Sequence, residues 1–540
     1  MSGAQALALL ALLAKTGAAA NAVELPEDTE LEARGTRIGT IAIRVLPIFD
    51  PQSPGERKSI FRLADRLHVD TRPSVIEAQL LFRSGDPFSR RVCDETERNL
   101  RALRFVKEPE IRVIGYHDGV ADLEVITHEL WTTNPGVSFS RSGGSNTTGF
   151  ELEELNLLGF GKHLAFDYQN DIDRSTYTLT WKDPNIVGSR WRDELELTES
   201  DDGEGQALLV ERPFFSLDAR WSAGFAIVHD DSIQSVYRLG HPVAEFQQDV
   251  LVADARFGWS KGLHGGWTRR WTGGLRHEKS QFSEAPDGSA FASLPDDRSL
   301  SYPYLRLERI QDDFDTTRNL DLIARTEDQH FGIRYAIELG WAATTWGSDR
   351  NAALLRAESR RGFRLGSGQS LFLHGKLTSR FEGGATRDAL LSGGTRYYRQ
   401  TSQRSTFFAA ITADVGQDLD ADHELLLGGD NGLRGYPLRY QTGSGRALMT
   451  IEQRVYTRYS LWQLADIGGA VFLDMGRTWG ESAFGPTENL GWLKDVGFGL
   501  RLGHSRSGLG NVIHLDVAFP LDGDRSISEV QFLVQTKRSY

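Results

Sequence analysis

From about residue 133 the sequence alternates between apolar and polar residues, and the helical period is absent. The segment VGFGLRLG at 496–503 places apolar side chains on one parity and glycine or arginine on the other. The segments NVIHLDVAF at 511–519 and EVQFLVQT at 529–536 follow a similar pattern. Because side chains alternate between the two faces of a strand, roughly 400 residues of such segments predict a large antiparallel β-structure.

Two all-β architectures fit this pattern, a soluble sandwich and a membrane barrel. A sandwich alternates because one face of each sheet is buried. We favour the barrel, because the polar parity carries Arg501, His514 and Asp516, and charged side chains suit a wet lumen. The mean hydropathy of −0.38 also suits strands with only one apolar face. The expected fold class is mainly β, with an antiparallel transmembrane barrel over 133–540.

Turn residues divide the barrel region into strands around a glycine-rich stretch at 428–437. Eleven to fourteen strands are expected before that stretch, and two polar segments, 280–300 and 383–404, are interpreted as loops on one rim. Five strands are expected after it, near 445–458, 465–476, 493–503, 511–519 and 529–537.

The N-terminal part has a different pattern. Residues 1–22 are expected to be a signal peptide, with an apolar core at 4–13 and a small-residue cleavage site at Ala20-Asn21-Ala22. Elsewhere no run of 18 apolar residues occurs, so no membrane-spanning helix is expected.

Residues 37–130 are expected to form a small α/β domain in the order strand, helix, helix, strand, strand. The first helix is expected to start at a capping box, Ser74-Val75-Ile76-Glu77, and to run to Phe82. Ser89 is expected to cap the second helix, and Cys93 lies on its apolar face, where core packing is the expected role. As the one cysteine of the chain, Cys93 excludes an internal disulfide.

The glycine-rich stretch GGDNGLRGYP surrounds one permanently charged residue, Arg434. A guanidinium group presents five donors in a rigid fork, which suits a carboxylate or a phosphate. On two later strands, Glu452 and Asp474 share the parity expected to face the lumen. If the stretch folds back into the barrel, Arg434 can reach both carboxylates, and charge-assisted hydrogen bonds would hold it there.

These residues carry a resemblance to a known family. Leu433-Arg434-Gly435-Tyr436 is similar to the arginine-glycine-aromatic motif of the BamA/TamA outer-membrane insertase superfamily, which includes the two-partner-secretion transporters. Phe472-Leu473-Asp474-Met475-Gly476 is similar to its F-x-D-x-G motif on the barrel wall, and 37–130 resembles a POTRA domain.

The resemblance implies sixteen strands, with the arginine loop between strands 11 and 12. It also implies that Arg434 bonds mainly to Asp474, with Glu452 in support. Two local features agree: Gly476 and Ala470 leave space beside Asp474, and a second arginine, Arg454, follows Glu452 on the same face.

The function implied is assembly or translocation of proteins at the outer membrane. A periplasmic POTRA domain would receive unfolded or extended client polypeptides, and the barrel would insert or pass them under control of the inward loop. The partners implied are these clients and outer-membrane lipids. The resemblance is also compatible with accessory assembly proteins as partners. The alternatives are a passive or substrate-specific pore and a surface or lipid-binding structural barrel. The net charge of −13 argues against a nucleic-acid partner.

One motif favours catalysis. Gly258-Trp259-Ser260-Lys261-Gly262 spells G-x-S-x-G, but that nucleophile motif requires a strand, a turn and then a helix. Alternating segments stand on both sides of it, so a hairpin is expected instead. No enzymatic activity, metal site or cofactor is expected.

Overall fold

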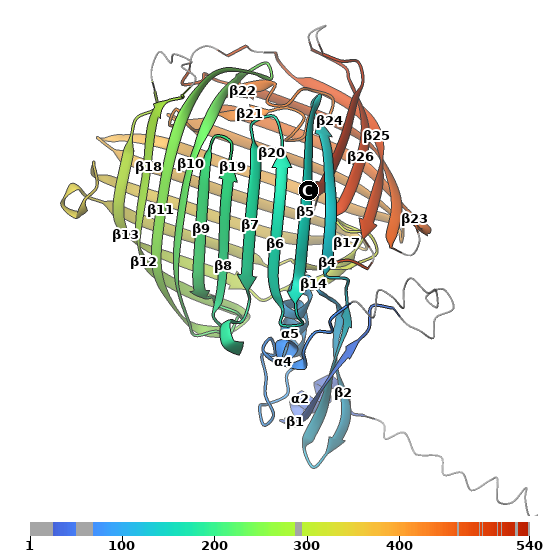
Figure 1. The fold of residues 1–540 in the computed structure, drawn as a ribbon. Helices are drawn as coiled ribbons and strands as arrows, with labels where there is room; N and C mark the ends of the chain where they lie inside the picture. The colour runs from blue at the N-terminus through green and yellow to red at the C-terminus, as the bar shows by residue number, and fades with distance from the viewer. Residues whose placement is uncertain are drawn as a thin grey trace, which may run out of the picture.

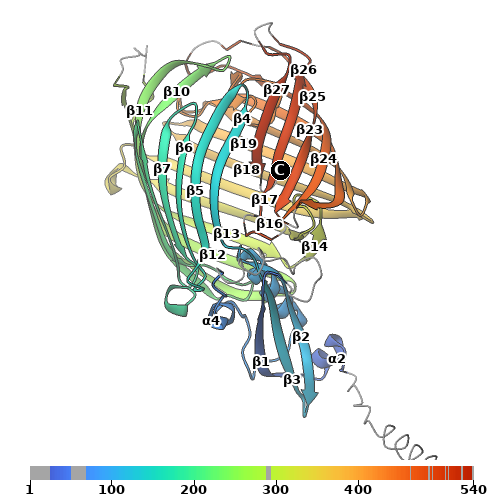
Figure 2. The same cartoon turned by 45° about the vertical axis from the view of Figure 1, so that its right-hand side comes forward.

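The chain combines a small α/β domain with a large β-barrel (Figures 1 and 2). The computed structural model describes residues 25–49, 68–286, 294–461, 464–484, 487–488, 490–504, 506–508, 510–523 and 527–537. The signal peptide expected at 1–22 lies outside these residues.

The barrel is closed, and it has twenty strands rather than the sixteen expected. Fifteen of them precede the glycine-rich loop, so the expected range of eleven to fourteen was too low. These strands are β4 (Thr133–Ser142), β5 (Ser145–Leu157), β6 (Lys162–Asn170), β7 (Ser175–Asp183), β8 (Arg192–Ser200), β9 (Gly203–Arg212), β10 (Trp221–Arg238), β11 (His241–His264), β12 (Trp267–Glu284), β13 (Arg298–Gln311), β16 (Ile333–Ala342), β17 (Ala352–Gly366), β18 (Gln369–Glu382), β19 (Ala385–Ser402) and β20 (Ser405–Gln417).

The five strands expected after the loop are confirmed. The arginine loop therefore lies between the fifteenth and sixteenth strands, not between strands 11 and 12. The five strands are β23 (Gly445–Leu461), β24 (Ala465–Trp479), β25 (Leu493–His504), β26 (Val512–Pro520) and β27 (Gln531–Lys537).

Of the two polar segments interpreted as loops, 383–404 is mostly strand, whereas 280–300 contains the β12–β13 connection expected of a loop. Residues 385–402 form β19, which pairs with β18 and β20, and 280–300 includes the end of β12 and the start of β13. In β19, Leu391 is exposed on the outside, whereas Arg396 forms an ion pair with Asp321. Charged side chains that face a wet lumen give a strand the composition of a loop, so polarity alone was misleading here.

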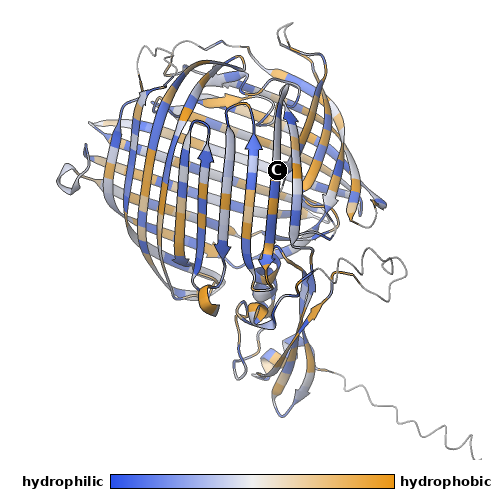
Figure 3. Ribbon diagram, in the orientation of Figure 1, coloured by the Kyte–Doolittle hydropathy of each residue, from blue (hydrophilic) through white to orange (hydrophobic). Residues whose placement is uncertain are grey.

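The apolar side chains of the alternating strands face the outside of the barrel. Hydrophobic and hydrophilic residues alternate along the strands (Figure 3). Leu275, Leu339 and Val471 are each more than half exposed, although exposing such side chains to water is unfavourable. A closed barrel with an apolar outside is the arrangement of a membrane-embedded protein, and the alternative of a soluble sandwich is wrong.

The first and last strands close the barrel through few bonds. In the described residues, β27 pairs with β4 at one position, Val534 opposite Arg141. On its other edge β27 pairs continuously with β26, from Val512–Lys537 to Ala518–Gln531. The β27–β4 seam is therefore the weakest junction in a barrel whose other neighbours are joined by longer ladders.

The small domain has the expected order of elements. Its sheet has the order β1-β3-β2, in which β1 is parallel to β3 and β2 is antiparallel to β3. None of the helices in the described residues is long and apolar enough to span a membrane. The elements are α2 (Asp28–Ala33), β1 (Arg37–Leu46), α4 (Pro73–Glu77), α5 (Arg90–Ala102), β2 (Val106–His117) and β3 (Val120–Glu129).

Helix boundaries in this domain differ in part from those expected. Helix α4 begins at Pro73 and ends at Glu77, so the capping box at Ser74 and the extension to Phe82 were wrong. Proline suits the first turn of a helix, where its missing N–H needs no partner. Ser89 occupies the N-cap position of α5, but its side chain makes no capping hydrogen bond. Cys93 is fully buried in the core as expected. Burial raises the pKa of the Cys93 thiol to about 12.

A hairpin between β13 and β16 lies between the small domain and the lumen. It is formed by β14 (Phe314–Arg318) and β15 (Thr326–His330). Asp328 accepts two hydrogen bonds from Arg101 of α5, at 2.7 and 2.8 Å. On the barrel side, Arg454 donates to the Leu320 carbonyl at 2.5 Å. Two short 3₁₀ turns lie elsewhere in barrel connections, at Ile186–Gly188 and Thr344–Trp346.

Candidate functional site

The loop between β20 and β23, residues 418–444, folds into the lumen as expected. Within it, β21 (Leu425–Leu427) and β22 (Gln441–Gly443) form a short hairpin, and Arg434 lies in the tip between them. Leu433 and Tyr436 are completely buried, and Arg434 is 2% exposed.

Arg434 makes its main contact with Asp474 of β24. Its Nε donates to Oδ2 at 2.6 Å and its Nη2 donates to Oδ1 at 3.0 Å, so both carboxylate oxygens are used. The Nη1 group donates to Glu452 of β23 at 3.2 Å. The fork geometry that the sequence predicted is therefore present, with Asp474 as the bidentate partner and Glu452 in support.

Two residues of the F-x-D-x-G motif shape the space around the guanidinium group. The Arg434 Cζ atom lies 3.3 Å from the centre of the Phe472 ring, in the position of a cation–π contact. At Gly476, an added Cβ would lie 2.8 Å from Leu427 and 3.2 Å from Leu433. A side chain there would force these two leucine side chains of the loop to shift, so glycine favours the close approach.

Glu452 is shared among three arginines. Besides Arg434, it accepts from Arg454 at 3.1 Å, as the sequence suggested, and from Arg501 of β25 at 3.2 Å. Glu452 has no exposed surface, so these cations offset the cost of burying its charge.

The sequence reasoning missed two partners of the loop. Asp516 of β26 lies 3.3 Å from Arg434 and also pairs with Arg501. The Gly435 N–H donates to Asp495 of β25 at 3.0 Å. The signal for Asp516 was present, since Arg501 and Asp516 were already placed on the lumenal parity. However, the odd or even position of a residue in a strand shows only which face it lies on, and not how far it lies from Arg434.

Tyr436 fixes the loop through its hydroxyl group. The Oη atom lies 2.8 Å from the Lys494 carbonyl and 3.1 Å from the Asp522 carbonyl. Burial raises the pKa of Tyr436 to about 12, so the hydroxyl keeps its proton and remains a donor.

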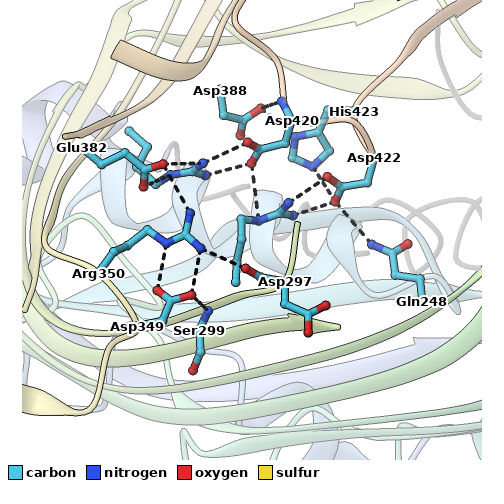
Figure 4. A network of polar contacts seen from close by, with 12 residues as sticks. Gln248, Asp297, Ser299, Asp349, Arg350, Glu382, Asp388, Asp420, Asp422 and His423 are labelled. Carbon is cyan, nitrogen blue, oxygen red and sulfur yellow. Dashed lines mark hydrogen bonds and ion pairs between the residues drawn. The ribbon is translucent and has the colours of Figure 1, made fainter. Parts of the chain in front are cut away.

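The first part of the loop is anchored at a second place (Figure 4). Asp422 accepts from Arg298 of β13 at 3.0 and 2.7 Å, and Asp420 accepts from Arg380 of β18 at 2.8 and 2.9 Å. These bonds fix the start of the loop to a different part of the wall from the one that holds Arg434. The loop therefore spans the lumen between two charged anchors.

The same anchor brings three metal-ligand residue types together. Donor atoms of Asp388, Asp420 and His423 lie within 4.8 Å of one another. Both oxygens of Asp420 already accept from Arg380, and the His423 Nδ1 atom lies 2.8 Å from Asp388. The cluster is therefore neutralised by protein cations, and it has the character of an ion-pair network.

The tip of the loop contacts the β27–β4 seam. The Ser142 Oγ of β4 donates to the Gly429 carbonyl at 2.6 Å. Gln535 of β27 donates to the same Ser142 Oγ at 3.2 Å. Gln535 also donates to the Gly429 carbonyl at 3.5 Å, so both strands of the seam bond to the loop, although few ladder bonds join them to each other in the described residues.

The G-x-S-x-G motif lies within the β11–β12 hairpin, as the sequence predicted. Ser260 is part of β11, and its hydroxyl donates to the Arg269 carbonyl of β12 at 2.8 Å. No helix follows the turn, so the motif lacks the context of a nucleophile elbow.

No protein-family model and no curated protein matches the sequence. Among solved structures, the chain is similar to CdiB from Acinetobacter baumannii, with 14% identity, a TM-score of 0.47 and coverage of 94% of this chain and 74% of that one. It is also similar to CdiB from Escherichia coli, with 13% identity, a TM-score of 0.48 and coverage of 92% of this chain and 76% of that one. A third similar structure is BamA from Haemophilus ducreyi lacking POTRA domains 1-3, with 13% identity, a TM-score of 0.38 and coverage of 92% of this chain and 84% of that one. Such distant likenesses carry no argument about family, so the membership suggested by the motifs stays a prediction.

Proposed function

We propose that this protein is an outer-membrane barrel that inserts or translocates other polypeptides, with a route at the β27–β4 seam. The observation that carries the proposal is the position of the loop, which is anchored by Arg434 and reaches the seam at Gly429. A closed barrel satisfies all its backbone groups, so a seam with one paired position among the described residues is a built-in weak point. Movement of the loop would release both strands of that seam.

In this proposal the small domain is a periplasmic POTRA domain that receives extended clients. Its three-stranded sheet has β1 and β2 at its edges, and an edge strand presents unpaired N–H and C=O groups. An extended client can add to such an edge as a further strand. The hairpin β14–β15 connects this domain to the lumen, which gives a client that binds the domain a physical link to the barrel.

A pore without insertase activity is the second candidate. It is favoured by a lumenal cavity of about 1,080 Å³, lined by strands β17–β20 and by the loop itself. A pore needs an open lumen and no movable seam, so the two candidates differ in what the seam does.

Reconstitution of the purified protein into liposomes separates these candidates. We expect the proteoliposomes to accelerate folding of an unfolded outer-membrane barrel client, measured by heat-modifiable migration and protease protection, compared with empty liposomes. Steady single-channel conductance without any acceleration would support the pore and overturn the insertase. In intact cells, protease should leave the small domain uncut, and its removal would contradict a periplasmic position.

A further inference from the structure

A second cavity, of about 360 Å³, lies where the small domain meets the barrel. Helix α5 contacts the β9–β10 connection there, because Glu95 accepts from the Leu217 N–H at 2.7 Å. Charged residues from one helix and three strands line the cavity: Arg98, Arg270, Arg334 and Arg360, with Glu95.

Glu95 of the lining and Glu308, which lies outside the lining, are already paired with arginines. Glu308 pairs with Arg270 at 3.1 Å and with Arg334 at 2.6 Å. Glu95 pairs with Arg91, which lies outside the cavity lining, at 3.1 Å. In the described residues, neither glutamate forms an ion pair with Arg98 or Arg360, the other two arginines of the lining.

Arg98 and Arg360 supply charge that is not held in a close ion pair. Within the part of the chain that the structure describes, neither has a carboxylate oxygen within 4.0 Å of its guanidinium nitrogens. Arg98 lies instead over the ring of Phe314, 4.1 Å from its centre. In addition, the Nε atom of Arg270 is buried without a hydrogen-bond acceptor. Such a group of donors and positive charges is complementary to an anion.

The positive charge continues from this cavity into the lumen. Arg360 and His330 line both the small cavity and the large one, where Lys376 of β18 follows, together with Arg396 of β19, which pairs with Asp321. Arg360 of β17 and His374 of β18 are direct cross-strand neighbours, and both face the large cavity.

The acids near this path are held by arginines of their own. Asp328 pairs with Arg101 at 2.7 Å, and Glu358 pairs with Arg306 at 2.6 Å. The path from the small domain to the interior therefore presents cations over several neighbouring elements, in a chain whose net charge is −13.

We propose that the small cavity is the entrance site for acidic segments of an extended polypeptide, whose carboxylates meet Arg98 and then Arg360. The proposal rests on the proposed function, because it names the client chemistry that the lumen accepts. A polypeptide fits better than a small anion, since the arginines are spread along two connected cavities rather than gathered around one point. The rings of Phe214 and Phe314 in the same lining can pack on the aliphatic parts of a peptide.

The test uses the full-length protein in detergent and a dye-labelled peptide of alternating glutamate and serine. Fluorescence anisotropy measures the Kd of this peptide and of a matched peptide with lysine in place of glutamate. We expect the acidic peptide to bind, the basic peptide not to bind, and added salt to weaken binding. The double variant Arg98→Gln/Arg360→Gln should raise the Kd at least about tenfold.

The matched control is Arg269→Gln/Arg399→Gln, which removes two exposed arginines outside both cavity linings. It should leave the Kd unchanged, and heat-modifiable migration should show folded barrels for both double variants. Equal binding of the two peptides, or an unchanged Kd for Arg98→Gln/Arg360→Gln, would overturn the proposal. Full competition by inorganic phosphate at the concentration of peptide carboxylates would also overturn it and indicate a small-anion site.

Failure of this proposal is distinguishable from failure of the proposed function. If proteoliposomes fold the barrel client but bind no acidic peptide, the insertase stands and the entrance site is wrong. If the peptide binds as expected but clients do not fold faster, the entrance site serves a pore and the insertase is wrong.

Discussion

The two edges of β27 are held in different ways. Toward β26 the strand has a continuous ladder of pairs, whereas toward β4 it has one paired position in the described residues. On the β4 side, side-chain bonds through Ser142 and the loop carbonyl at Gly429 take the place of the missing ladder. Closure of this barrel therefore depends in part on a loop, and that loop depends on Arg434.

The strongest test of this difference fixes the seam covalently. Val534 lies directly opposite Arg141, and paired strand residues are about 4.5–5.5 Å apart, which suits a disulfide. We expect Arg141→Cys/Val534→Cys to lose nearly all client insertion when oxidised and to recover when reduced. Insertion is measured in proteoliposomes by heat-modifiable migration of the client.

The control for the seam disulfide lies on the other edge of the same strand. Leu515 is directly opposite Val534 across the continuous β26–β27 ladder. Oxidised Leu515→Cys/Val534→Cys should insert clients at the wild-type rate. Full activity of the oxidised seam variant would show that the seam does not open.

The next effect concerns the anchor of the loop. Arg434→Ala leaves Asp474 and Glu452 buried with one cation fewer, and breaking a buried pair costs about 3–5 kcal/mol. We expect insertion to fall by about tenfold or more, while the abundance of folded barrel stays near wild type, because the strand ladders are intact.

Arg439→Ala is the matched control on the same loop. Arg439 pairs with Asp173, but both side chains are 22% exposed, so the pair contributes less. Its variant should retain most of the activity. Wild-type insertion by Arg434→Ala would show that the loop is not held by this arginine, or that its position does not matter.

A smaller effect separates the two carboxylates. A double-mutant cycle of Arg434→Ala with Asp474→Ala should give a larger coupling energy than the cycle with Glu452→Ala, by on the order of 1 kcal/mol or more. The reason is geometric, since Asp474 accepts two bonds from Arg434, whereas Glu452 also has Arg454 and Arg501. If the effects of Arg434→Ala and Asp474→Ala on insertion simply add, the contact between these two side chains does not matter for function.

The smallest effect is a pH dependence at the second anchor. The hydrogen bond to Asp388 raises the pKa of His423 above its usual 6.5. A raised folded pKa means that His423 stabilises the anchor fully below pH 6.5, and that this contribution is lost as the pH rises through the folded value. The side chain is about half exposed, so the contribution is small.

We therefore expect protease cleavage near residues 418–424 to increase modestly as the pH rises above 6.5 in the wild type. His423→Gln should cleave at a rate that does not change over this interval. An identical pH profile in both proteins would assign the effect to another group.

The sequence predicted the lumenal anchor better than the barrel that holds it. Parity placed Glu452 and Asp474 correctly, because side-chain direction in a strand depends only on the odd or even position. The strand count failed, because lumenal Arg, Asp and Glu give strands such as β19 the composition of loops. The contact of Asp516 with Arg434 could not be predicted, because it depends on how β24, β25 and β26 are arranged in space, and no local sequence pattern contains that arrangement.

The burial of Cys93 has a consequence for spectroscopy. Alkylating reagents and spin labels react with the thiolate, and a thiol with a pKa of about 12 is almost entirely protonated near neutral pH. Because Cys93 is the one cysteine of the chain and has no exposed surface, the wild-type protein is silent to such reagents. Two cysteines introduced at the loop tip and the seam would then carry the only labels, and the distance between them could be followed without a cysteine-free background.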